Sequence, residues 1–99
     1  MSNTVNVSVQ VLPLHPDPYP IVDGAIQEIQ SAGVKYEVGP METTMEGDLD
    51  ALLEVVKAAH RACFVEGVEH VVTVVKIGEK VGGSSMEEKV GKYRVKSEK

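Results

Sequence analysis

Apolar and polar side chains alternate at the start of the chain, and this alternation predicts a strand. Every second position is a valine and the positions between are polar: Val5, Val7, Val9 and Val11 alternate with Asn6, Ser8 and Gln10. Strand side chains point to opposite faces at period two, so this strand has one apolar face and one polar face. Four prolines follow between residues 13 and 20, where neither a ladder position nor a helix interior suits them. The last, Pro20, is suited to the first turn of a helix.

Two later stretches have apolar residues three and four positions apart, which predicts two helices. The first contains Val22, Ala25, Ile26, Ile29 and Ala32, and Gly33 supplies a left-handed stop. The second contains Leu49, Leu52, Leu53, Val56, Ala59 and Cys63; it begins after Asp48, a capping residue, and runs until Gly67. Residues 34–46 lie between them and are interrupted by Gly39 and Pro40, which predicts two short strands.

Residues 70–77 form a β-branched run that is apolar at consecutive positions, so it predicts a strand covered on both faces. The order is therefore βαββαβ, an α+β ferredoxin-like sandwich with a four-stranded antiparallel sheet and two helices on one face. We expect one domain over residues 1–99, with a core at about 4–78 and a short C-terminal segment at 79–99 whose end, 91–99, is frayed. Because two helices cover only one face, a second copy of the chain is expected to cover the other.

Composition narrows the classes of partner. The 99 residues carry a net charge of −5 and include three Tyr, one Phe and no Trp, which disfavours nucleic acid as a partner. No stretch approaches the roughly 20 apolar residues of a membrane span. The single cysteine excludes an internal disulfide and residues 1–4 lack signal-peptide features, so we expect a cytoplasmic protein.

The candidate chemistry of binding lies on polar strand positions. Asn6, Ser8 and Gln10 of the first strand are expected to join Thr43, Thr44 and Glu46 of the third and Thr73 or Lys76 of the fourth. If this stripe lies opposite the helices, a polar pocket with apolar walls forms where a partner subunit covers the sheet. The alternative is that these are rim residues, and that the threonines serve β-propensity alone.

Catalytic and metal chemistry have weaker support. His60 and Cys63 lie three residues apart, but a zinc site needs three or four convergent ligands, and a buried thiol beside surface imidazoles explains them better. The proline-rich loop at 13–20 also lacks the Arg and the amide donors that acylphosphatase chemistry requires. We therefore expect no catalytic residue, metal or cofactor, and an enzyme using Cys63 and a histidine stays an alternative.

Two stretches carry a resemblance to a known family, residues 36–47 and residues 73–90. The most specific element is Pro-Met-x-Thr-x-x-Glu-Gly at 40–47, and the similarity extends from Val5 to Val90. Together they resemble the small thiamine-binding proteins, once known as an uncharacterised domain of about 100 residues. Glu42 departs from that pattern, since the family usually has Gly there. The resemblance implies a ferredoxin-like domain that forms dimers pairing into tetramers, has no catalytic residues, and binds thiamine or its hydroxymethylpyrimidine portion.

The residues carried over from the resemblance are Ser8, Thr43 and Glu46. Glu46 would accept a hydrogen bond from the amino group of an aminopyrimidine, while the two hydroxyls complete the edge. Tyr36 either supports the thiazolium cation by a cation–π contact or packs on a neighbouring strand residue. The full expected ligand-binding set is Ser8, Gln10, Tyr36, Thr43, Thr44 and Glu46, at a subunit interface of a homotetramer. The alternative is a regulatory or scaffold module that binds another protein and no small molecule.

Overall fold

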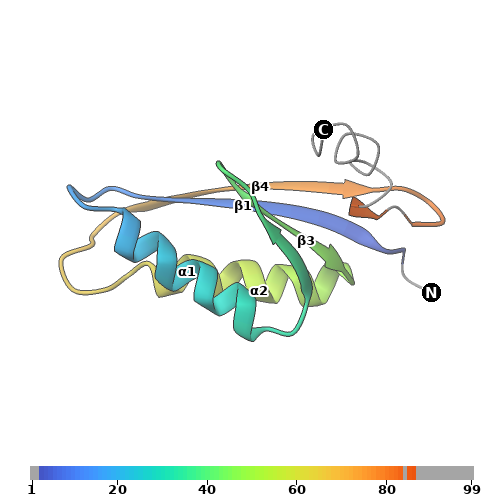
Figure 1. Cartoon of the computed structure of the whole chain (residues 1–99), viewed down its shortest axis with the longest axis horizontal. Helices are drawn as coiled ribbons and strands as arrows, with labels where there is room; N and C mark the ends of the chain where they lie inside the picture. Colours follow the sequence, from blue (N-terminus) through green and yellow to red (C-terminus); the bar gives the residue numbers. More distant parts are fainter. Residues whose placement is uncertain (1–2, 84, 87–99) are drawn as a thin grey trace, which may run out of the picture.

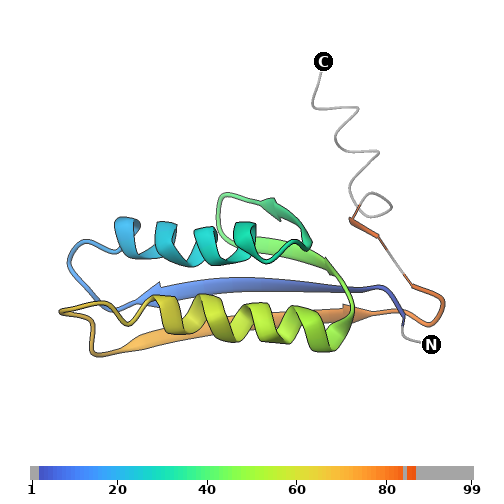
Figure 2. The same ribbon diagram turned by 90° about the horizontal axis from the view of Figure 1, so that it is seen from below.

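A computed structural model describes residues 3–83 and 85–86 and shows a four-stranded sheet with two helices. The elements in chain order are β1 (Val5–Pro13), α1 (Tyr19–Ser31), β2 (Lys35–Val38), β3 (Thr43–Gly47), α2 (Leu49–Ala62) and β4 (Val71–Glu79). The strand order in the sheet is β2-β3-β1-β4, and all neighbouring pairs are antiparallel. Both helices lie on the same face (Figure 1), where they run side by side (Figure 2). The ferredoxin-like βαββαβ prediction is confirmed.

Alternation along β1 divides the sheet into a helix-covered face and a face that we call the open face. Val5, Val7 and Val9 are at most 4% exposed and pack in the core under the helices. The open face carries the polar residues that alternate with them on β1. Because β1 is bonded to β3 on one side and β4 on the other, its register determines on which face of the sheet each paired side chain of β3 and β4 lies.

Both helices begin as the sequence predicts. Pro20 lies in the first turn of α1, and Gly33, two residues beyond its end, has φ 79°. The carboxylate of Asp48 accepts a hydrogen bond from the Ala51 N–H at 3.2 Å and caps α2. The expected end of α2 near Gly67 is wrong: the helix ends at Ala62, and Cys63 N–H bonds to the His60 carbonyl three residues back, which tightens the last turn.

Pro13 belongs to β1, although we expected none of the prolines to take a ladder position. It lies opposite Val71, at the end of the strand. The next residue, Leu14, donates its N–H to the carbonyl of His70 at 2.9 Å, so the nitrogen of Pro13 points away from β4. β3 pairs with β1 only as far as Val9. The proline therefore lacks its N–H on a side of β1 where the described part of the chain has no strand to accept a bond.

The predicted last strand is present as β4, but residues 3–83 and 85–86 do not cover it on both sides. β4 is an edge strand, and its apolar side chains at Val72, Val74, Val75 and Ile77 are 36–51% exposed. Val72 and Val74 share the open face with Leu12, which is 39% exposed. The cover expected from a second copy stays a prediction.

After β4 the chain turns back over its own beginning. Gly82 donates its N–H to Asn3 Oδ1 at 3.1 Å, and Asn3 Nδ2 donates to Glu79 at 2.8 Å. Met86, 7% exposed, then donates its N–H to Glu46 Oε1 at 2.7 Å. Part of the predicted C-terminal segment thus packs on the sheet, and the frayed end expected at 91–99 lies outside the described residues.

The cap of α2 provides a test of this description. Asp48→Ala removes the carboxylate that accepts from Ala51 N–H, so we expect the free energy of unfolding to fall by about 1 kcal/mol in urea denaturation. Asp50→Ala, in the same turn, removes an equal charge without removing the cap and is expected to have the smaller effect. Equal losses in the two variants would contradict the cap.

Candidate functional site

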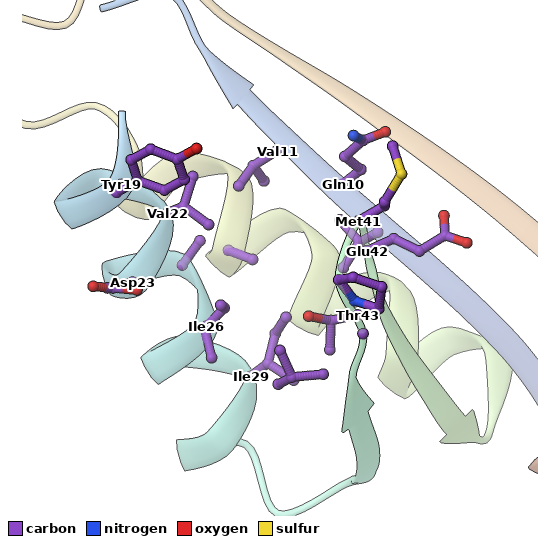
Figure 3. Close-up of a pocket in the computed structure, with 16 residues that line it drawn as sticks. Gln10, Val11, Tyr19, Val22, Asp23, Ile26, Ile29, Met41, Glu42 and Thr43 are labelled. Atoms are coloured by element: carbon purple, nitrogen blue, oxygen red, sulfur yellow. The ribbon is translucent and has the colours of Figure 1, made fainter. Parts of the chain in front are cut away.

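A cavity of about 250 Å³ lies between α1 and the hairpin of β2 and β3 (Figure 3). Its cause is the unequal length of the central strands: β1 continues to Pro13, but β3 is paired with it only up to Val9. Beyond that point the hairpin tip at residues 39–42 is held by its own bond from Gly39 N–H to the Glu42 carbonyl, at 2.9 Å. The cavity occupies the space where the sheet loses its β3 partner.

The cavity has a buried floor and an exposed rim. The floor residues are at most 5% exposed: Val9, Ala25, Ile29, Thr43 and Ala59. Thr43 is the polar member of this floor, and Figure 3 shows its side-chain oxygen on the side facing α1. Tyr19 and Met41 at the rim are 78% and 73% exposed. A ligand would therefore meet apolar walls and one buried hydroxyl at depth, and mixed chemistry at the mouth.

The charged residues that line the cavity are both acidic, Asp23 and Glu42. Asp23 lies on the outer side of α1 with its carboxylate directed away from the cavity (Figure 3). Glu42 extends over β1, where its Oε2 lies 3.1 Å from Nζ of Lys76 on β4. The lining residues include no Lys, Arg or His. Among the described residues, the lining thus offers an anion no cationic side chain of its own, and the carboxylate nearest the mouth is that of Glu42.

The structure divides the six expected ligand-binding residues between three places. Gln10 and Thr43 line the cavity. Thr43 and its neighbour Thr44 point to opposite faces, because Thr43 pairs with Val9 of the core and Thr44 with Ser8 of the open face. The cluster that we expected of the polar strand residues is therefore formed only in part, because Thr43 lies on the helix-covered face. Tyr36, 37% exposed, pairs with Met45 and shares the helix-covered side, but does not line the cavity.

Ser8, Thr44 and Glu46 form a second polar group on the open face. The Ser8 hydroxyl is buried and has no hydrogen-bond partner within the part of the chain that the structure describes. Glu46 is already engaged, by the N–H of Met86 and by Nζ of Lys35 at 3.6 Å. A ligand amino group would have to share the Glu46 carboxylate with both, which favours the cavity over the open face as the binding site.

The cysteine and its neighbouring histidine each have another hydrogen-bond partner. Cys63 is fully buried and donates its thiol to the Ala59 carbonyl at 3.5 Å, and desolvation raises the pKa of this thiol. Nδ1 of His60 lies 2.6 Å from the Thr73 hydroxyl, and its ring meets the Phe64 ring edge-on. Over residues 3–83 and 85–86, no three His, Cys, Asp or Glu side chains gather as a metal site. None of the described helices has the length and apolar character of a membrane span.

Sequence reasoning missed the α1 wall and the hairpin tip as parts of a site. Val22 and Ile26 were expected only as a buried helix stripe, yet they line the cavity beside Met41. The signal that was available is the combination of Gly39 and Pro40, which ends the pairing, with a first strand longer than its partner.

Comparison with known proteins places the chain among relatives of the same fold. The model of a family described as "Thiamine-binding protein" matches residues 7–94. A UPF0045 protein from Clostridium perfringens is 55% identical over 94 residues, which cover 93% of this chain and 99% of the relative. A Bacillus cereus structure of the domain of unknown function DUF77 is 48% identical with a TM-score of 0.89, covering 97% of this chain and 95% of that one. A Thermotoga maritima structure, of a protein with a suggested role in thiamine biosynthesis or salvage, is 40% identical with a TM-score of 0.84, covering 92% and 99%.

The burial of Cys63 predicts slow modification. Because the thiol is enclosed and its raised pKa keeps it protonated, we expect labelling by a disulfide reagent at pH 8 to be at least about 100-fold slower in the folded protein than in denaturant. The absorbance of the released thiolate gives both rates. Rapid labelling of the folded protein would revive an enzyme that uses this cysteine.

Proposed function

The chain belongs to the thiamine-binding protein family, and we propose that it binds thiamine, or the hydroxymethylpyrimidine portion of thiamine, without transforming it. The observation that carries this proposal is the cavity between α1 and the β2–β3 hairpin, which lies within the matched residues. Its apolar walls, buried hydroxyl and acidic mouth suit a small aromatic cation.

The floor suits the pyrimidine ring. Thr43 offers a buried hydroxyl that both donates and accepts, and Gln10 offers an amide on the open-face side of the cavity. An aminopyrimidine edge presents an amino donor beside ring-nitrogen acceptors, so the Thr43 hydroxyl can pair with either group. Ala25 and Ile29 supply apolar surface for the ring faces. The volume of about 250 Å³ is at the small end of ligand cavities, which suits burial of this one ring.

The rim suits the thiazolium. This ring carries a permanent positive charge, and Glu42 places a carboxylate at the mouth. The exposed ring of Tyr19 adds a surface for a cation–π contact of about 0.5–2 kcal/mol. Tyr19 thus takes the role that we first considered for Tyr36.

Binding without catalysis is supported by the chemistry of the lining. The cysteine and the histidine of the enzyme alternative are not among the lining residues of the cavity. Cys63 is enclosed and bonded to its own helix. The cytoplasmic location expected from the lone cysteine remains part of this proposal.

A second copy of the chain is proposed to cover the open face. Leu12, Val72 and Val74 form an apolar patch there, beside the buried Ser8 hydroxyl. Gln10 alternates onto the same face and also lines the cavity, so the mouth borders this surface. A homodimer, and a tetramer built from it, would place the cavity mouth at the edge of a subunit interface. The same apolar patch also fits the alternative function, a scaffold module that binds a different protein.

Adjacent threonines on opposite faces test the site. Thr43→Val removes the hydroxyl at the cavity floor with little change in volume, so we expect thiamine affinity to fall about tenfold in isothermal titration, the loss of one buried hydrogen bond. Thr44→Val is the matched control on the open face and is expected to leave the affinity unchanged. A loss of thiamine affinity in Thr44→Val alone would place the site on the open face. If the unmodified protein gave no heat with thiamine or with hydroxymethylpyrimidine, the proposed function would be overturned.

The oligomer is tested by charge on the patch. Val74→Lys places an ammonium group in the proposed interface, so we expect light scattering to show a smaller assembly than the unmodified protein. Val65→Lys, at a similarly exposed valine beyond α2, is the control and should leave the mass unchanged. An unmodified protein that is monomeric would contradict the proposed homo-oligomer.

A further inference from the structure

An ion pair crosses the sheet beside the cavity mouth. Lys76 projects from β4 and Glu42 from the hairpin tip, and β1 runs between them. The two side chains meet over β1 at 3.1 Å, with the lysine 68% and the glutamate 33% exposed. Glu42 is also a lining residue of the cavity. The pair therefore ties an ammonium group of the distant edge strand to the rim of the candidate site.

This contact decides which charge the mouth presents. Lys76 is a lysine that the fold brings to the rim, and its ammonium group is occupied by Glu42. The remaining charged lining residue, Asp23, is acidic. With the pair formed, the Lys76 ammonium group is offset by the Glu42 carboxylate, and the mouth offers a ligand no free ammonium group from Lys76. Without the Glu42 carboxylate, Lys76 would be a free cation next to the same opening.

The two ends of the ligand make this charge matter. Thiamine carries its hydroxyethyl arm on the thiazolium ring, and the phosphate esters of thiamine are formed on that arm. With the pyrimidine on the buried floor at Thr43, the arm lies toward the rim. A phosphate group there would need cationic donors, and it would meet a carboxylate whose partner ammonium is already engaged.

We propose that Glu42 is a specificity-determining residue: by holding Lys76 at the rim it makes the cavity select thiamine over its phosphate esters. The inference rests on the proposed thiamine binding, and it assigns the phosphorylation state of the ligand. Glu42 acts both by neutralising Lys76 and by repelling the phosphate directly.

Isothermal titration of thiamine and thiamine diphosphate tests the proposal on the full chain. We expect the unmodified protein to bind thiamine at least about tenfold more tightly than the diphosphate, at low ionic strength. Glu42→Gln keeps the shape of the side chain and removes its charge. It should narrow that ratio at least about fivefold, by weakening thiamine and strengthening the diphosphate.

Two further variants distinguish the effect of Lys76 on the affinity ratio from the effect of the net charge of the chain. Glu54→Gln on α2 breaks the exposed Lys57–Glu54 pair, at 2.8 Å, and changes the charge of the chain by the same amount; its ratio should match the unmodified protein. In the double variant Glu42→Gln with Lys76→Met, the diphosphate affinity should be lower than in Glu42→Gln alone, by the part that the freed Lys76 ammonium group contributes. Melting temperatures of all variants show that each is folded.

The outcomes are distinct. Three results would overturn the role of Glu42 and leave the proposed function in place. In the first, Glu42→Gln binds thiamine with an unchanged ratio of affinities; in the second, Glu54→Gln changes that ratio as much as Glu42→Gln does. In the third, the unmodified protein binds thiamine and the diphosphate equally. Retention of the gained diphosphate affinity in the double variant would also overturn that role, because Lys76 would then take no part. If neither thiamine nor thiamine diphosphate gave heat, the proposed function would be overturned, and this inference with it.

Discussion

The burial of alternate valines on β1 under two helices is the constraint on which the rest of the structure depends. β1 is bonded on both sides, so its period of two is transmitted to β3 and β4 through the register. A slip of one residue would place Asn6 and Ser8 in the core and Val7 on the open face. The slip would also remove the alternate valines from the core under the helices, and the loss of their apolar burial disfavours that arrangement. The facing of each candidate residue follows from this one choice.

The same strand creates the cavity by being longer than its partner. The pairing of β3 with β1 ends at Thr43, the first residue of β3, and beyond it the helix layer faces a gap in the sheet. Because β1 has no β3 partner beyond Val9, the surface there is concave, and the Thr43 hydroxyl lies buried in it. The nitrogen of Pro13 points to this side of β1, where the loss of an N–H removes no ladder bond.

The sequence was sufficient to predict the fold because its signals are local. Alternation on β1, the Asp48 cap and the left-handed Gly33 each follow from neighbouring residues. The candidate site was only partly predictable, because it depends on where strands stop pairing. Thr43 and Gln10 were named in advance, but the separation of Thr43 from Thr44 and Glu46 required the register. Tyr19 and Met41 gave no periodic signal, and the Glu42–Lys76 contact joins positions 34 residues apart across a third strand.

The bond from the Met86 main chain to the Glu46 carboxylate connects the path of the chain after β4 to the polar centre of the open face. A main-chain proton held by a carboxylate exchanges with solvent only when that bond opens. Whatever competes for Glu46, whether a neighbouring subunit or a small molecule, must release this proton. Deuterium uptake at Met86 therefore reports on competition for the Glu46 carboxylate at the open face.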